Sequence, residues 1–183
     1  MDMQCKAAAG SLYRIGEDLT INKVISDLTI PNGIVWSLDN EQMYFIDTPT
    51  QQVVSYNFNK GTGRISNESV SVEIPIEMGM PDGLAIDTDG MLWIALYGGG
   101  GIARWNPITG SLIEFIKLPA LNITNCAFVG DQLDSLIVTS AREGLTAEQL
   151  EEFPDSGNVF LISNLATRGI KINPAKLLLN DFN

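Results

Sequence analysis

A short motif recurs along this chain and constrains its fold more than any other feature. In each copy a polar side chain precedes an apolar run typical of a β-strand, and in two copies it lies between a proline and a glycine. The copies are Ile30–Ser37, Gly79–Asp87 and, more weakly, Ile123–Phe128. Their polar residues Asn32, Asp82 and Asn125 are 50 and 43 residues apart. A period of about 40 to 50 residues is the size of one four-stranded blade of a β-propeller.

The middle copy contains the strongest candidate for a functional residue, Asp82. Pro81 fixes the backbone on one side, and Gly83 permits unusual dihedral angles on the other. The carboxylate is therefore held where a loop meets the start of a strand, a common place for a metal ligand or a general base. A surface turn with a solvated aspartate has the same pattern, so this motif alone leaves both interpretations open.

The runs of β-forming residues can be grouped into blades. Ser11–Ile15 and Asn22–Ile25 form a hairpin that resembles the last two strands of one blade. The next blade comprises Gly33–Ser37, Met43–Asp47, Gln52–Phe58 and Ser69–Ile74, and the one after it comprises Leu84–Asp87, Met91–Leu96, Gly101–Trp105 and Ser111–Ile116. A last blade contains Asn125–Val129, Ser135–Ser140 and Gly157–Ile162. We therefore predict an all-β fold, a β-propeller with an incomplete set of about three to four blades.

The number of blades is too small for a closed ring, because propellers usually close with about four to eight. An open stack exposes its sheet edges, which favours aggregation. We expect residues 1–183 to form a single partial propeller domain whose N-terminal blades are missing. The chain would then be a fragment, a truncated gene product, or a protein that self-associates through its open edges.

Three further segments have simpler interpretations. The pattern predicts a short helix over Thr146–Phe153, capped by Thr146 and stopped by Pro154. The glycine run Gly98–Gly101 predicts a tight turn, because no Lys-Ser/Thr pair and no helix follow it as in a phosphate-binding loop. The tail Lys171–Asn183 is ambiguous between strand and coil.

The composition excludes several classes of function. The chain has 22 acidic and 11 basic residues, a formal net charge of -11, so we expect neither nucleic acid nor an anionic membrane as a partner. It has no histidine, which excludes His-based triads and imidazole zinc sites. Its two cysteines, Cys5 and Cys126, do not suggest a disulfide framework, and residues 1–6 lack the apolar core of a signal peptide. We therefore expect a cytoplasmic location.

The motifs, taken in order, resemble those of the gluconolactonase, SMP-30 and regucalcin family. The resemblance runs from about residue 10 to residue 163. It includes the Pro-Asn-Gly and Pro-Asp-Gly copies and the segments Asp89–Ala95, Asn125–Gly130 and Leu136–Arg142. Val129 is a small departure, because the family usually has glycine there.

This resemblance implies a six-bladed propeller with one divalent cation in its central channel, held by a glutamate, an asparagine and an aspartate. Asn32 matches the asparagine ligand, and Asp82 matches the aspartate that is both ligand and proposed catalytic base. The glutamate and the substrate-contacting residues of the family lie on blades that precede this chain, so its substrate-binding residues are unknown. The ion implied is Ca²⁺, whereas Zn²⁺, Mg²⁺ and Mn²⁺ also accept such oxygen ligands.

The resemblance also implies an activity, the metal-dependent hydrolysis of a small-molecule sugar lactone to an aldonic acid, with Asp82 as general base. The alternative is a truncated, non-catalytic propeller remnant that binds a cation or another ligand. For Asn125 we favour a structural turn over a ligand, and for Trp36, Trp93 and Trp105 we favour core packing. For Arg142 we expect a structural ion pair with a carboxylate.

Overall fold

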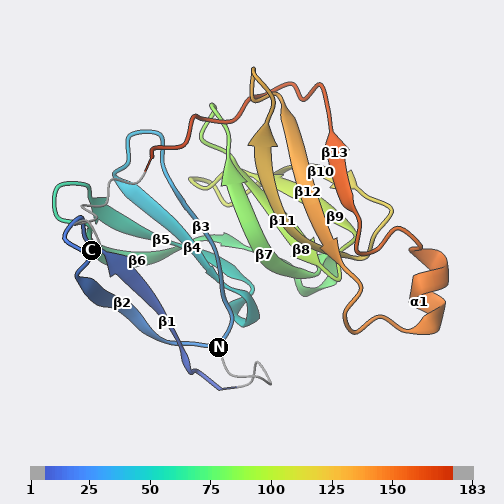
Figure 1. The fold of residues 1–183 in the computed structure, drawn as a ribbon, viewed down its shortest axis with the longest axis horizontal. Coiled ribbons are helices and arrows are strands. Elements are labelled where there is room, and N and C mark those ends of the chain that lie inside the picture. Colours follow the sequence, from blue (N-terminus) through green and yellow to red (C-terminus); the bar gives the residue numbers. More distant parts are fainter. Residues whose placement is uncertain (1–6, 175–183) are drawn as a thin grey trace, which may run out of the picture.

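The computed structural model describes residues 7–174, and these residues fold into four antiparallel sheets with very little helix (Figure 1). A hairpin pairs β1 (Gly10–Ile15) with β2 (Ile21–Leu28). The second sheet contains β3 (Pro31–Trp36), β4 (Gln42–Asp47), β5 (Gln52–Asn59) and β6 (Arg64–Glu73). The third contains β7 (Met80–Ile86), β8 (Leu92–Tyr97), β9 (Gly101–Trp105) and β10 (Leu112–Lys117). The fourth contains β11 (Asn122–Val129), β12 (Ser135–Ala141) and β13 (Val159–Ile162).

Within each sheet the strands are hydrogen-bonded in the order in which the chain visits them. This meander is the topology of propeller blades, and it confirms the prediction of a partial all-β propeller. The strand bounds differ by a few residues from those expected. The largest difference is at β6, which begins at Arg64 because its ladder with β5 continues as far as the pair Asn59–Arg64.

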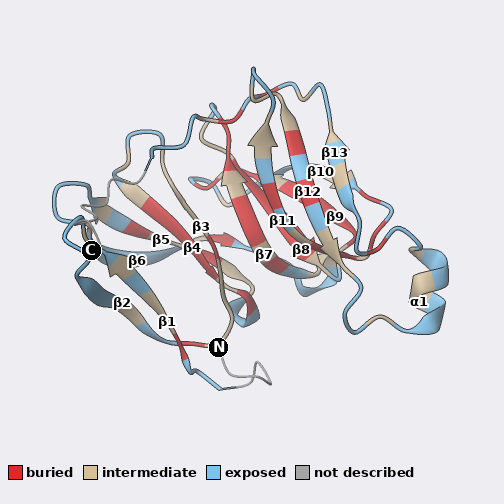
Figure 2. Cartoon of the chain, viewed as in Figure 1, coloured by how far each residue is buried: buried red, intermediate tan, exposed pale blue. Residues whose placement is uncertain are grey.

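The core lies between successive sheets. One apolar cluster joins the second sheet to the third, another joins the third to the fourth, and a smaller one packs the β1–β2 hairpin onto the second sheet. Buried residues are concentrated in β4, β7, β8 and β9, whereas in the β1–β2 hairpin only Gly10 and Leu28 are buried (Figure 2). Trp93 and Trp105 are buried, as predicted for core residues. Trp36 is half-buried and forms an edge-to-face pair with Phe58, with 5.7 Å between ring centroids.

The recurring motif is a bulge at the start of each innermost strand. In β3 the register steps from Pro31 opposite Asp47 to Ile34 opposite Phe45, so that one extra residue is inserted. The same step occurs in β7 between Pro81 and Leu84, and β11 has a register shift between Ile123 and Asn125. Because a bulge interrupts the alternation of side chains, it can re-aim the polar residue that it contains.

The motif glycines are required for close approach, not for the unusual dihedral angles that the sequence suggested. Neither Gly33 nor Gly83 has a positive φ. A Cβ atom at Gly33 would lie 2.8 Å from the carbonyl oxygen of Asp82, and one at Gly83 would overlap the side chain of Asn125 and lie 2.8 Å from its Cα. Each glycine therefore allows the neighbouring inner strand to approach more closely than any side chain would permit.

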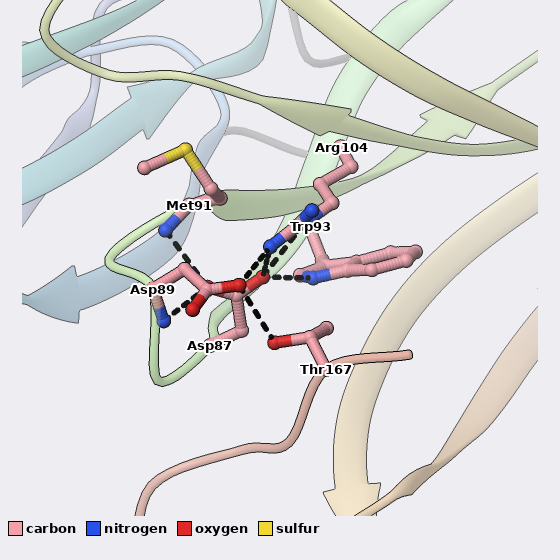
Figure 3. A network of polar contacts seen from close by, with 6 residues as sticks. All are labelled: Asp87, Asp89, Met91, Trp93, Arg104 and Thr167. Carbon is pink, nitrogen blue, oxygen red and sulfur yellow. Dashed lines mark hydrogen bonds and ion pairs between the residues drawn. The ribbon is translucent and has the colours of Figure 1, made fainter. Parts of the chain in front are cut away.

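Asp87, at the end of β7, is the centre of a polar network (Figure 3). Its side chain is fully buried and accepts hydrogen bonds from the backbone N–H groups of Asp89 and Met91, each at 2.9 Å. The indole Nε1 of Trp93 donates at 2.9 Å, and Arg104 forms an ion pair with the same carboxylate at 2.7 Å. Such full pairing is what makes a buried charge tolerable.

The same network attaches the segment that follows β13. Asp89 pairs with Arg104 at 2.7 Å and accepts a hydrogen bond from the hydroxyl of Thr167 at 3.3 Å. The backbone N–H of Thr88 donates to the carbonyl of Arg168 at 2.8 Å. After β13 the chain returns across the ends of the inner strands (Figure 1), and these bonds hold it there.

The remaining expectations were partly confirmed. Helix α1 (Ala147–Glu152) has the predicted Thr146 cap, which forms a capping box with Gln149. The glycine run forms a turn that leads directly into β9. Residues 171–174 are irregular, and the rest of the ambiguous tail lies outside the described residues, as does Cys5. None of the helices in the described part of the chain is long and apolar enough to span a membrane.

We expect Gly83→Ala to lower the free energy of unfolding by about 1–3 kcal/mol, because the added methyl group would push the β11 backbone away from β7. Gly61→Ala is the matched control, since a Cβ there meets only Asn59 at 3.4 Å. Chemical denaturation measures both variants. Equal stabilities for the two would show that the inner strands are not closely packed at Gly83.

We expect Arg104→Met to destabilise the fold by about 3–5 kcal/mol, because it leaves the buried Asp87 carboxylate without its cation. Arg64→Met, which removes an exposed cation from β6, is the control. The measurement is the denaturation midpoint of each variant. A loss for Arg104→Met no larger than for the control would contradict a structural role for the network.

Candidate functional site

The bulges bring the three recurring polar residues to the same end of the inner strands. Gly33, next to Asn32, approaches the backbone of Asp82, and Gly83, next to Asp82, lies against Asn125. Residues that are 50 and 43 positions apart in the sequence therefore lie side by side on β3, β7 and β11. The structure thus places Asn32 beside Asp82 and Asn125 beside Gly83.

Asp82 is a half-buried carboxylate without a cationic partner. Burial raises its pKa to about 6, and hydrogen bonds from the side chain of Asn32 and the backbone N–H of Gly83 oppose this rise in part. Within residues 7–174, Arg104 is the only basic side chain that forms an ion pair, and it pairs with Asp87 and Asp89. The Asp82 carboxylate is therefore partly desolvated, and its negative charge is not neutralised by an ion pair within this region.

Asn32 is held by a residue that the sequence analysis missed. Its Nδ2 donates to the hydroxyl of Thr48 at 3.1 Å, and that hydroxyl donates to the carbonyl of Pro81 at 2.8 Å. Thr48 begins the 3₁₀ turn η1 (Thr48–Thr50) immediately after β4. The pairing of β4 with the first motif copy could be predicted from the sequence. The contact from Thr48 to Pro81 could not, because it joins two blades and no local sequence pattern indicates it.

The contacts of Asn125 and Arg142 are those of structural residues. The side-chain oxygen of Asn125 accepts a hydrogen bond from the next backbone N–H, that of Cys126, at 2.8 Å. Asn125 lies at the bulge within β11 and not in the turn that the sequence suggested. Arg142 forms no ion pair with any residue between 7 and 174, so the expected salt bridge is absent there. Its aliphatic stem instead packs over Gly157, where a side chain would collide with it.

Tyr97, at the end of β8, lies on the rim of the same site. The pKa of its phenol is raised mainly by burial and also by the negative charges of Glu143 and Asp82. The phenol donates to the backbone carbonyl of Glu143 at 3.1 Å. Tyr97 therefore adds a polar, half-buried hydroxyl to the surroundings of Asp82.

The described residues supply part of a cation site. No three acidic or cysteine side chains converge anywhere in residues 7–174. Asn32 and Asp82 together offer amide and carboxylate oxygens, which are ligands that a hard cation prefers. This pair fits one side of a Ca²⁺ site, and the remainder of the usual six to eight oxygens would come from water and from groups beyond these residues.

A cavity of about 480 Å³ lies farther along the inner strands, and it does not include Asn32 or Asp82. Its walls are mostly apolar and comprise Ile34–Trp36, Leu84–Ile86, Cys126–Phe128 and Ile170–Asn173, with smaller contributions from Asn40 and Phe58. The buried thiol of Cys126 has a pKa raised to about 12 by burial, so it is not a reactive nucleophile. The polar site is therefore separate from this cavity.

Comparison with known proteins gives consistent matches. Residues 1–142 match the family model described as the SMP-30/Gluconolactonase/LRE-like region. Regucalcin from Oryctolagus cuniculus is 38% identical over 161 residues, which are 88% of this chain and 54% of that protein. The chain thus spans about half the length of the curated relatives that it matches.

Solved structures agree with this match. A calcium-binding protein, regucalcin from Agrobacterium tumefaciens, superimposes with a TM-score of 0.86 and 29% identity over 93% of this chain and 57% of that one. A luciferin-regenerating enzyme superimposes with a TM-score of 0.80 and 32% identity over 88% of this chain and 54% of that one.

The raised pKa of Asp82 predicts how stability depends on pH without a cation. Since the folded pKa is about 6 and the ordinary value is 3.8, ionisation of Asp82 destabilises the fold as pH rises through this interval. We expect Asp82→Asn in EDTA to raise the melting temperature at pH 7.5 more than at pH 4. Asp131→Asn, at an exposed turn, is the control. A pH-independent difference for Asp82→Asn would contradict the desolvated carboxylate.

Proposed function

The chain belongs to the SMP-30/gluconolactonase/LRE-like family, and on this basis we propose that Asn32 and Asp82 are two ligands of a divalent cation in a lactone hydrolase. The observation that carries the proposal is the Asp82 carboxylate, half-buried, free of any ion pair in the described region and held beside the amide of Asn32. A carboxylate in this environment is destabilised unless it is protonated or binds a cation.

We favour Ca²⁺ as the ion, because both protein ligands are hard oxygens and one relative's structure is described as that of a calcium-binding protein. Mg²⁺, Mn²⁺ and Zn²⁺ remain alternatives that accept the same donors. When bound, the cation would polarise the carbonyl of the lactone and make it more electrophilic.

Asp82 would act as general base. Its half-buried carboxylate, held by the hydrogen bonds from Asn32 and Gly83, would remove a proton from an attacking water. The water oxygen forms a bond to the lactone carbonyl carbon, the ring C–O bond breaks, and the released ring oxygen takes the proton that Asp82 removed from the water. The product is the open-chain aldonic acid. The hydrogen bonds from Asn32 and Gly83 orient the carboxylate for this transfer.

The other half of the site would come from outside the described residues, because the relatives are about twice as long as the matched segment. A second copy of the chain, joined through the open faces of the sheets, is one source of these groups. The second candidate function is a non-catalytic cation-binding or ligand-binding propeller. It is favoured by the lack of a third converging acidic ligand within residues 7–174.

Lactone hydrolysis by the purified chain tests the proposal, with size-exclusion chromatography to separate monomers from assemblies. We expect hydrolysis that requires Ca²⁺, stops in EDTA and follows the assembled fraction. Asp82→Ala should lower the rate by about 100-fold or more, as loss of a general base does. Asp131→Ala, at the exposed turn after β11, is the matched control.

Two results would decide against this function. Hydrolysis that survives EDTA or Asp82→Ala would show that the reaction does not use this site. A folded chain that binds Ca²⁺ but hydrolyses no lactone in any assembly state would favour the non-catalytic alternative.

A further inference from the structure

The hydroxyl of Thr48 lies between the side chain of Asn32 and the backbone carbonyl of Pro81. Thr48 is only 4% exposed, so water does not compete for its hydrogen bonds. Its Oγ1 is 2.8 Å from the carbonyl oxygen of Pro81, the residue before Asp82, and 3.1 Å from the side-chain nitrogen of Asn32. One buried hydroxyl thus connects the Asn32 side chain on β3 to the backbone that carries Asp82 on β7.

The Thr48 hydroxyl has one proton to donate, and this limits how the Asn32 amide can face it. A proline carbonyl can only accept, so the single proton of the Thr48 hydroxyl is donated to Pro81. Toward Asn32 the hydroxyl oxygen can then only accept. The amide must therefore turn its NH₂ group toward Thr48 and its carbonyl oxygen away. The same NH₂ group also donates to the Asp82 carboxylate, so Thr48 and Asp82 together distinguish the two ends of the amide, which are nearly equivalent in shape.

We infer that Thr48 is a positioning residue that presents the Oδ1 atom of Asn32 to the cation. The nature of that cation rests on the proposed function, whereas the orientation of the amide does not. Residues that orient a metal ligand in this way commonly change metal affinity by about 10-fold to 100-fold when their hydrogen bond is removed.

The position of the hydroxyl is itself fixed by the neighbouring backbone. The carboxylate of Asp47 accepts hydrogen bonds from the backbone N–H groups of Thr29 at 2.9 Å and Ile30 at 2.6 Å. The backbone N–H of Thr48 donates to the carbonyl of Ile30 at 3.1 Å. These bonds hold the start of η1 against Thr29 and Ile30, at the beginning of the first motif copy. The position of the Thr48 hydroxyl is therefore fixed by the backbone of η1 and by the chain before β3.

Thr48→Val tests the inference, because valine keeps the shape and removes the hydroxyl. Thr48→Ser keeps the hydroxyl and should rescue the effect. Ser71→Ala is the matched control, since the Ser71 hydroxyl also donates to a proline carbonyl, that of Pro107 at 2.6 Å, but contacts neither proposed ligand. Titration calorimetry of the full chain with Ca²⁺ should give an affinity about 10-fold or more lower for Thr48→Val. The affinities of Thr48→Ser and Ser71→Ala should stay within about 3-fold of the parent.

The side-chain NH₂ signals of Asn32 in an NMR spectrum give a second readout that needs no metal. They are identified by their loss in Asn32→Asp. We expect Thr48→Val to shift these signals and to speed their exchange with solvent, and Thr48→Ser to leave both close to the parent. This readout separates the two proposals, because a parent chain that binds no Ca²⁺ defeats the proposed function while the NMR spectrum still tests the role of Thr48.

Three results would overturn the inference. The first is a folded Thr48→Val chain with the Ca²⁺ affinity of the parent. The second is a set of Asn32 amide signals that Thr48→Val does not move. The third is an equal loss of affinity in Thr48→Val, Thr48→Ser and Ser71→Ala, which would reflect general destabilisation.

Discussion

The close contact between neighbouring inner strands is the constraint on which the candidate site depends. Gly33 faces the backbone of Asp82, and Gly83 faces Asn125, at distances that no side chain would allow. Because each contact occurs at a bulge, the polar residue of one blade lies beside the backbone of the next. The same glycines that pack the blades therefore bring together an amide and a carboxylate that are far apart in the sequence.

Two aspartates on or next to β7 differ in how completely their carboxylates are paired. Asp87 is fully buried, yet it has backbone, indole and guanidinium donors, and its network attaches the returning segment through Thr167. Asp82 is less buried, but within residues 7–174 its hydrogen-bond partners are limited to Asn32 and the Gly83 backbone, and its pKa is raised. The fold thus stabilises one charge completely and leaves the other available for a cation or a proton.

Much of this fold could be predicted from local patterns. The period of the motif gives the size of a blade, the apolar runs give the strands, and Thr146 with Gln149 gives the helix cap. The contacts between blades could not be predicted in this way. The steric role of Gly83, the Thr48 bridge to Pro81 and the position of Arg142 each depend on residues that are remote in sequence. The Asp87 network could be predicted only in part, because the Asp-x-Asp-Gly turn can be recognised in the sequence but the pairing with Arg104 cannot.

The central claim is that Asn32 and Asp82 form one side of a cation site at the bulged ends of β3 and β7. Anomalous diffraction from crystals of the chain soaked in Mn²⁺ or Tb³⁺ tests it most directly, because it locates the ion without reference to activity. We predict a peak within coordination distance of both the Asp82 carboxylate and Asn32 Oδ1. A folded chain in which these side chains point apart, or in which the ion binds elsewhere, would contradict the account.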